Sequence, residues 1–152
     1  MLASPLEMAR LAACVANDGQ MLESRFLVSK VDPGKDARDK ARTQTFNPTL
    51  MGAAMRPDTA AILRDMMHEV TTGGTAAGVF DGVSVPVCGK TGTAQNREFD
   101  KEPHSWFIGF APYGGREHPL AARYSFACIV ENGGYGKKVA GRICADVLKR
   151  LF

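Results

Sequence analysis

VSVPVCGKTGTAQ, residues 83–95, is the stretch from which the architecture of this chain is best worked out. Its first half alternates apolar residues at Val83, Val85 and Val87, which is the pattern of a half-buried strand. Its second half, residues 89–93, carries a cation, two hydroxyls and two glycines. We expect this half at the end of the strand, where backbone N–H groups can come close to an anionic ligand.

Pro86 indicates that the strand lies at the edge of its sheet, because a residue without an N–H group is tolerated mainly there. An edge strand can accept a peptide by strand addition, and the carboxylate of that peptide would then meet Lys90 and the threonines. The side-chain period of two puts Thr91 and Thr93 on one face and Lys90 on the other. Lys90 would therefore have to reach round to the same ligand.

Residues 89–91, Gly-Lys-Thr, have three competing interpretations. The first is a glycine-rich turn with an exposed lysine. The second is a nucleotide-binding loop of the form G-x-x-x-x-G-K-[ST]. It fails because Ser84 stands where the first glycine is needed, and because residues 94–100 lack the apolar period of a phosphate-binding helix. The third is the Lys-Thr-Gly motif of active-site serine penicillin-recognising enzymes, at residues 90–92.

Length and composition bound the fold and the function. The 152 residues, 45% of them hydrophobic, suffice for one domain and are too few for two ordinary ones. The net charge of +3 is small and scattered, so nucleic acid is not an expected partner. No apolar run reaches the length of a membrane span and the N-terminus lacks the pattern of a signal peptide, so we expect no targeting segment in this chain.

The four cysteines are Cys14, Cys88, Cys128 and Cys144. They form no C-x-x-C pair and the three histidines are equally dispersed, so metal-ligand spacing is absent. Each cysteine lies in an apolar segment, which favours small buried thiols, although the even count also permits disulfides.

The first half of the chain predicts two helices with strands between them. Residues 4–7, Ser-Pro-Leu-Glu, form a capping box, and Asn-Asp-Gly at 17–19 ends this apolar helix, which we expect in the core. Residues 21–31 and 42–46 are interpreted as strands joined by a solvated hairpin tip, and residues 47–55 as a loop.

A second helix should begin at Pro57 and Asp58, where a proline and a carboxylate suit the first turn. Its apolar stripe consists of Ile62, Leu63, Met66, Met67 and Val70. His68 lies beside the stripe, and we expect a structural or surface role for it.

The last third of the chain predicts two buried strands and a helix. Residues 105–111 and 124–130 are apolar on both parities, as in strands covered on both faces. Residues 137–152 form a helix that should dock on the sheet through Val139, Ala140, Ile143, Cys144, Val147, Leu148 and Leu151. The expected fold class is α+β, with three consecutive antiparallel strands and helices from both ends of the chain packed against them.

Four segments together carry a resemblance to a known family: SPLEMARLAACVANDG (4–19), CGKTGTAQ (88–95), HSWFIGFAP (104–112) and FACIVENGG (126–134). They resemble penicillin-binding protein transpeptidase domains over essentially the whole chain, residues 1–152. The resemblance implies a partial penicillin-binding protein (β-lactamase-like) fold with the motif strand at the sheet edge. In that family the sheet continues with two strands from upstream sequence, so the FACIVENGG strand should have an unpaired outer edge and the first helix should expose apolar surface.

The resemblance implies acyl transfer through an active-site serine that attacks a D-alanyl-D-alanine peptide. That serine belongs to a Ser-x-x-Lys motif and is aided by a Ser-x-Asn motif. Every serine of this chain lacks a lysine three places later and an asparagine two places later. The chain therefore resembles only the C-terminal half of such a domain and is not expected to be active alone.

The matching positions imply four site residues and no cofactor or metal. Lys90 would supply positive potential and a hydrogen bond to the Ser-x-Asn serine, and Thr91 would bind the carboxylate of the substrate or β-lactam. Gly92 would allow close backbone approach, and Thr93 would give a backbone N–H to the oxyanion hole.

Two functions from different classes stay open. In the first, the chain is part of a peptidoglycan D,D-transpeptidase on the extracytoplasmic face of the bacterial membrane, completed by the missing N-terminal half. Its ligands would be the peptidoglycan stem peptide or a β-lactam. In the second, it is a non-catalytic domain that keeps the fold and acts by association with a partner or a second copy.

Overall fold

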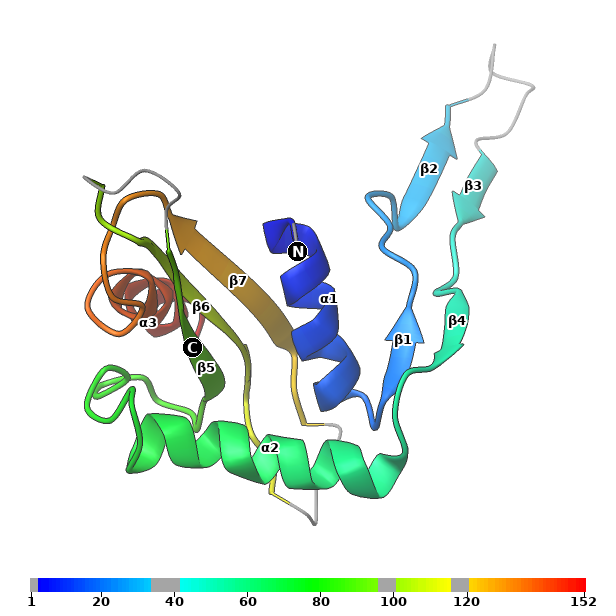
Figure 1. The fold of residues 1–152 in the computed structure, drawn as a ribbon. Helices are drawn as coiled ribbons and strands as arrows, with labels where there is room; N and C mark the ends of the chain where they lie inside the picture. Colours follow the sequence, from blue (N-terminus) through cyan, green and yellow to red (C-terminus); the bar gives the residue numbers. More distant parts are fainter. Residues whose placement is uncertain (1–2, 34–41, 96–100, 116–120) are drawn as a thin grey trace.

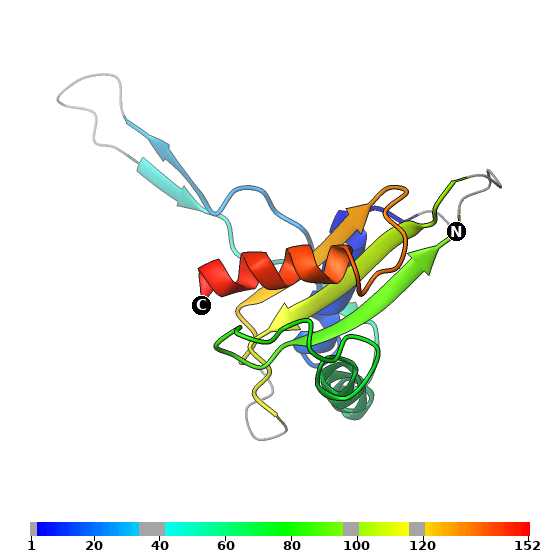
Figure 2. The ribbon, with the colours of Figure 1, turned by 90° about the vertical axis from the view of Figure 1, so that its left-hand side faces the viewer.

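The computed structural model describes residues 3–33, 42–95, 101–115 and 121–152. An antiparallel sheet, in the order β5 (Cys88–Ala94), β6 (His104–Ala111) and β7 (Tyr124–Val130), occupies its centre. One face of the sheet carries α1 (Pro5–Ala16), and the other carries α3 (Ala140–Leu151), as Figure 2 shows. The expected α+β class and strand sequence are confirmed.

Four shorter strands and a long helix complete the fold (Figure 1). Their bounds are β1 Gln20–Leu22, β2 Ser29–Asp32, β3 Arg42–Thr45, β4 Leu50–Ala53 and α2 Pro57–Thr72. β1 pairs with β4 and β2 with β3, and together they form a narrow ribbon that projects away from the body. α2 packs on β5 and on α1.

The central strand β6 is covered on both faces, as its sequence predicts. Phe107 and Phe110 are both fully buried but point to opposite sides. Phe110 packs with Ala12 of α1, whereas Phe107 packs with Ala140 of α3. We call these two sides the α1 face and the α3 face.

Two glycines of the sheet leave room for the rings of Phe107 and Phe126. A Cβ on Gly89 would overlap the Phe107 ring, and one on Gly109 would lie 2.8 Å from Cζ of Phe126. Gly89 therefore has a packing role within the motif strand, because any side chain there would displace Phe107 from the core.

The start and end of α1 follow the sequence prediction. The Ser4 amide donates to Oε2 of Glu7 at 2.7 Å, and the Glu7 amide donates to Ser4 Oγ at 3.3 Å, which completes the capping box. The helix ends before Asp18 and Gly19, whose φ angles of 50° and 80° are left-handed. A side chain at Gly19 would also collide with Met55.

A buried ion pair joins α1 to α2. Nη1 of Arg64 lies 2.6 Å from Oδ1 of Asp18 and donates to the Val15 carbonyl at 3.1 Å. The Arg64 side chain is only 5% exposed, so Asp18 and the end of α1 provide its counter-charge and its acceptor.

Several predicted boundaries are wrong. Residues 83–87 are not a strand, because β5 begins at Cys88. Their alternating valines pack instead around Leu148 of α3, and Val87 is buried there. Pro86 precedes the strand, although the edge position that it suggested is correct, since β5 is a terminal strand of the sheet.

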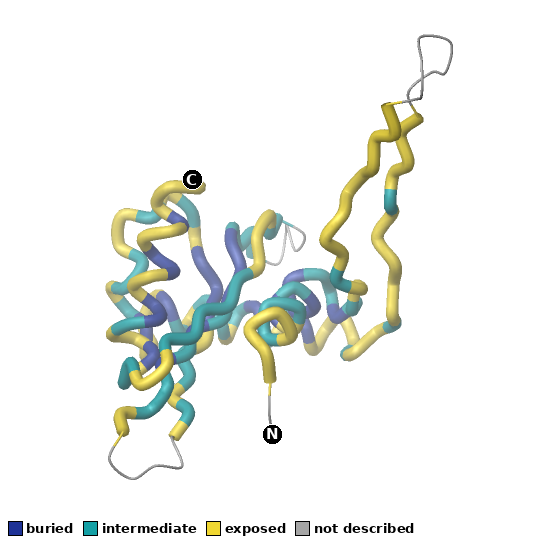
Figure 3. Tube along the Cα trace, turned by 90° about the horizontal axis from the view of Figure 1, so that it is seen from above, coloured by how far each residue is buried: buried dark blue, intermediate teal, exposed yellow. Residues whose placement is uncertain are grey.

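The interpretation of residues 47–55 as loop is also wrong, since β4 lies there and pairs with β1 in the register Gln20↔Ala53. The expected strand at 21–31 is divided between β1 and β2. Nearly all of this ribbon is exposed (Figure 3), so it lacks the alternation of burial by which strands are predicted. The predicted hairpin tip lies mostly outside the described residues.

Both predicted helix stripes are only partly right. Leu63, Met67 and Val70 of α2 and Ala140, Cys144 and Leu148 of α3 pack in the core as predicted, whereas the other helical members of each stripe point outward. In α2, Ile62 and Met66 are exposed. The faces that contact the body carry small residues, such as Ala60 in α2 and Ala140 in α3, because these let the helices approach closely. The outer residues Ile143, Val147 and Leu151 of α3 are 44%, 51% and 46% exposed.

Candidate active site

The Lys-Thr-Gly motif lies inside β5. The sequence had instead predicted it at the end of the strand. β5 pairs with β6 alone among the described strands, so its other edge is open. Residues 90–93 therefore combine a fixed backbone with free access from one side.

The register places the motif side chains on two faces, in agreement with the predicted parity. Thr91 lies opposite Phe107 and so belongs to the α3 face together with Thr93. Lys90 pairs with Ile108 and belongs to the α1 face. Its Nζ donates to the Thr91 carbonyl at 2.8 Å, which holds the ammonium group beside the strand.

A cavity of about 510 Å³ brings the motif residues together despite this parity. It lies beside the first turns of α1, and its lining includes Lys90 and the strand residues Trp106, Ile108 and Ile129 of the α1 face. Its lining residues are Ala3, Met8, Lys90, Thr91, Gly92, Thr93, Ala94, His104, Trp106, Ile108 and Ile129. Lys90 and Thr93 are exposed and Thr91 and Gly92 half-buried, so all four predicted site residues reach this cavity.

Gly92 has little room for a side chain. A Cβ there would lie 3.0 Å from Cβ of Trp106, its cross-strand partner. A Cβ on Gly136, in the segment before α3, would in turn lie 3.0 Å from the Gly92 nitrogen. Neighbouring backbone and ring therefore pack closely around this glycine, as expected where a chain must come near.

Thr75 is a candidate site residue that the sequence analysis did not identify. It follows α2, and its hydroxyl shares a 3.1 Å hydrogen bond with the Thr91 hydroxyl. Its only signal in the sequence is the threonine- and glycine-rich composition of residues 71–78, which predicts a loop. Thr75 restricts the rotation of the Thr91 side chain and thereby orients its hydroxyl.

The described residues that line this cavity include threonine hydroxyls but no serine or cysteine. Ser105 is fully buried, and its Oγ accepts the Ala140 amide at 3.1 Å. Cys88 is also fully buried, and burial raises the pKa of its thiol to about 12, so it stays protonated at neutral pH. Neither is available as a nucleophile toward this cavity.

The two described histidines near these elements have structural contacts. Nδ1 of His68 lies 3.3 Å from the Val87 carbonyl oxygen, and the His68 ring packs at a tilt on the Tyr113 ring with centroids 4.4 Å apart, in keeping with its expected structural role. His104 accepts the Asn132 amide through Nδ1 at 3.0 Å, which fixes the turn after β7. His104 also lines the cavity, at the far end of the motif strand.

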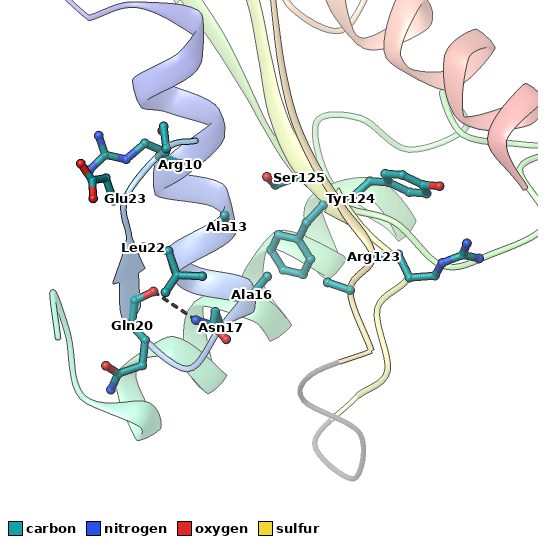
Figure 4. A pocket seen from close by; sticks show the side chains of 13 residues that line it. Arg10, Ala13, Ala16, Asn17, Gln20, Leu22, Glu23, Arg123, Tyr124 and Ser125 are labelled. Carbon is teal, nitrogen blue, oxygen red and sulfur yellow. Dashed lines mark hydrogen bonds between the residues drawn. The ribbon is translucent and has the colours of Figure 1, made fainter. Parts of the chain in front are cut away.

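A second cavity, of about 320 Å³, lies between α1, β1 and the start of β7 (Figure 4). Arg10, Glu23 and Arg123 border it, and its lining contains none of the motif residues. Within the described ranges, Nε of Arg10 and Oγ of Ser24 are buried there without a hydrogen-bond partner. This cavity has no convergent set of reactive groups, so the first is the candidate active site.

Residues 1–149 match the family model described as penicillin binding protein transpeptidase domain. The chain belongs to the penicillin-binding protein transpeptidase family. The resemblance seen in the four sequence segments is therefore confirmed.

Two curated members of this family are similar to nearly the whole chain. Peptidoglycan D,D-transpeptidase PbpA of Mycolicibacterium smegmatis is 33% identical over 149 residues, which cover 97% of this chain and 28% of the relative. Penicillin-binding protein 1A of Neisseria gonorrhoeae is 27% identical over 156 residues, which cover 96% of this chain and 17% of the relative. The chain thus spans less than a third of the length of these relatives.

Solved structures of penicillin-binding proteins share the fold. Penicillin-binding protein A of M. tuberculosis, in a ceftriaxone acyl-enzyme complex, matches with a TM-score of 0.78 at 27% identity. The match covers 95% of this chain and 31% of the M. tuberculosis chain. The D,D-transpeptidase domain of a peptidoglycan glycosyltransferase from Eggerthella lenta also has a TM-score of 0.78, at 29% identity, covering 98% and 32%. These matches confirm the partial transpeptidase fold.

No helix of the described residues is long and apolar enough to cross a membrane. The described residues also contain no group of three or more His, Cys, Asp and Glu side chains placed to hold a metal ion.

Proposed function

We propose that residues 1–152 are the C-terminal part of a penicillin-binding protein transpeptidase domain and provide the substrate-docking side of its active site. The site belongs to a peptidoglycan D,D-transpeptidase acting on the extracytoplasmic face of the bacterial membrane. Its ligands are D-alanyl-D-alanine stem peptides and β-lactams. The observation that carries the proposal is that all four predicted site residues, on an open-edged strand, line one largely apolar cavity.

Thr91 and Lys90 bind the anionic end of the ligand. The Thr91 hydroxyl, oriented by Thr75, donates to the carboxylate of the stem peptide or β-lactam. The Lys90 ammonium group, held at the neighbouring carbonyl, adds positive potential and reaches the Ser-x-Asn serine. Hydrogen bonds to charged groups are worth about 1.5–3 kcal/mol each, which is enough to select an anionic terminus.

Gly92 and Thr93 act through their backbone. Because Gly92 has no side chain, the ligand backbone can come close to the open edge of β5 and pair along it, as in strand addition. Thr93 provides an N–H group to the oxyanion hole. The loss of one such donor typically costs about a hundredfold to a thousandfold in rate.

The attacking hydroxyl comes from outside these 152 residues. It belongs to a Ser-x-x-Lys motif, which this sequence lacks, as it lacks Ser-x-Asn. The apolar surface formed by Met8, Trp106 and Ile108 beside the motif is the place where the segment with the nucleophile packs. That segment closes the cavity and excludes water from the acyl transfer.

A gel with fluorescent penicillin tests this proposal. The purified chain alone should remain unlabelled, because it has no suitable nucleophile. When the upstream part of the domain, carrying Ser-x-x-Lys, is mixed in or fused, a covalent label should appear on that upstream part. Label on residues 1–152 by themselves would contradict the proposal.

Matched variants test whether the labelling depends on the motif. Lys90→Met and Thr91→Val should reduce labelling of the assembled protein, whereas Thr43→Val, in the exposed strand β3, should not change it. Equal labelling of all assembled variants would show that the motif does not serve the ligand.

A non-catalytic domain acting by association is the second candidate, and the exposed apolar surface favours it. β7 has a free outer edge among the described strands, and Leu6 and Leu11 of α1 are 47% and 40% exposed, as expected from the sequence. A second copy or a companion chain could cover these surfaces. Labelled penicillin that never reacts with any assembly of the chain, together with a stable homodimer, would favour this candidate.

A further inference from the structure

Cys128 and Cys144 come from different elements but face each other. Cys128 of β7 lies directly opposite Phe107 of β6, so its side chain points to the α3 face. Cys144 of α3 is buried in the cluster that contains Phe107, and Cys128 packs against this cluster. The strand and the helix thus bring two thiols to one place between them.

The two thiols interact directly and unequally. Burial raises the pKa of both thiols, that of Cys144 to about 12. The hydrogen bond between the two thiols acts against this increase at Cys128 and adds to it at Cys144. Cys128 is also the less buried of the two, so it is the thiol that meets a reagent from solution first.

We propose that Cys128 and Cys144 form a redox site at which a low-molecular-weight disulfide introduces an intramolecular disulfide between β7 and α3. Both thiols are free in the structure, which therefore represents the reduced form. The oxidised form ties the last helix to the strand at the free side of the sheet.

The reaction is an ordinary thiol–disulfide exchange in two steps. The Cys128 thiolate attacks one sulfur of the small disulfide, a mixed disulfide forms, and the first small thiolate leaves and takes up a proton. Cys144 then loses its proton to water and attacks the Cys128 sulfur, which expels the second small thiolate. Overall, two protein thiols lose two electrons and two protons, and one small disulfide is reduced to two thiols.

The other two cysteines are separated from this pair by the sheet. Cys88 lies opposite Phe110, so it points to the α1 face, where its thiol donates to the Arg64 carbonyl at 3.4 Å. Cys14 is buried in α1 on that same face. A bridge from either one to Cys128 or Cys144 would have to pass through the core, so these two serve as internal controls.

Oxidised glutathione and the full chain provide the test. The number of thiols titrated after denaturation should fall from four to two, and peptide mapping should find a single bridge between Cys128 and Cys144. Because the pKa of both thiols is raised, the rate should increase about tenfold for each unit of pH above neutrality. The midpoint of urea unfolding should rise on oxidation and return after reduction.

Serine variants identify the order of attack. Cys144→Ser should accumulate a glutathione adduct on Cys128, whereas Cys128→Ser should react much more slowly, and Cys14→Ser/Cys88→Ser should form the bridge as the original chain does. Four thiols that persist in the folded protein while a free cysteine peptide is fully oxidised would overturn the proposal. A bridge between other cysteines would overturn it as well. The test needs no transpeptidase activity, so its outcome is independent of the proposed function.

Discussion

Thr91 and Thr93 lie two residues apart on one face of β5, but the proposed function uses different atoms of each. Thr91 contributes its side-chain hydroxyl, which Thr75 orients. Thr93 contributes its backbone N–H, so the identity of its side chain matters less. The two threonines therefore make a matched pair for separating side-chain from backbone roles.

In the assembled protein we expect Thr91→Val to lower the second-order rate of penicillin acylation about 10- to 100-fold, because a hydrogen bond to a carboxylate is lost. Thr91→Ser should keep most of the rate. Thr93→Val should change it by much less than Thr91→Val. Stopped-flow or gel-based acylation kinetics would measure all three, and equal losses for both valine variants would argue against the assigned roles.

The ion pair between Asp18 and Arg64 gives a second prediction at this scale. Asp18→Asn should keep the left-handed backbone at residue 18, which asparagine tolerates, but it leaves the buried Arg64 without its counter-charge. Removal of one partner of a fully buried pair costs about 3–5 kcal/mol in unfolding free energy, and because the Asp18 side chain is 32% exposed we expect a smaller loss here. Urea unfolding would measure it, with Glu131→Gln, at an exposed position, as a control that should stay near the original value.

The α1 helix has a pH-dependent start. The Ser4 amide and then the Ser4 hydroxyl, by hydrogen bonding to the carboxylate, hold the pKa of Glu7 below its ordinary value of 4.5. Because the folded-state pKa is the lower one, this stabilisation is present above pH 4.5 and is lost as the pH falls through the folded-state value.

We therefore expect Glu7→Gln to be less stable than the original chain at neutral pH and equally stable in strong acid. Unfolding midpoints across a pH series would test this, and Glu69→Gln, near the end of α2, serves as the comparison. A difference that does not diminish toward low pH would rule out the capping carboxylate as its cause.

The elements differ in how far their sequence predicts them. The cap of α1 and the first turn of α2 depend on neighbouring residues, and β6 depends on burial of both faces; these predictions are confirmed. β7 is a strand as expected, but its residues are half-buried or exposed, because it is a terminal strand of the described sheet. β4 was missed because its residues are mostly exposed and carry no periodic signal.

Long-range contacts account for the remaining differences. Ile143 and Val147 of α3 point outward because other residues of the helix meet the sheet. The sequence of the helix alone does not determine which of its faces packs there. The motif was located from local sequence, and its placement in one cavity supports the proposal. The Thr75–Thr91 and Asp18–Arg64 contacts join residues 16 and 46 positions apart, so no local pattern could reveal them.

At the scale of the whole molecule, apolar side chains remain on the surface in several places. The exposed stripe Ile143, Val147 and Leu151 of α3 lies on the outside of the sheet layer, and the ribbon carries Phe26, which is 88% exposed. Large exposed apolar patches favour association between chains. We therefore expect another polypeptide to cover these apolar surfaces of the domain.

We expect the purified chain to self-associate with increasing concentration when no partner is present. Light scattering should show a mass above 16.4 kDa, and Ile143→Lys/Val147→Lys should shift it back toward the monomer. Lys149→Gln, on another side of the same helix, is the matched control and should not. A well-folded original chain that remains monomeric at all concentrations would contradict this expectation.

The hydrogen bond between Thr75 and Thr91 has a consequence for natural selection, given the proposed function. Residue 75 lies in a separate segment from the motif, yet it sets the orientation of the hydroxyl that captures the drug. Antibiotic pressure could then favour substitutions at position 75 that weaken capture while every letter of the motif survives. Resistance surveillance that reads only the motif would overlook such strains.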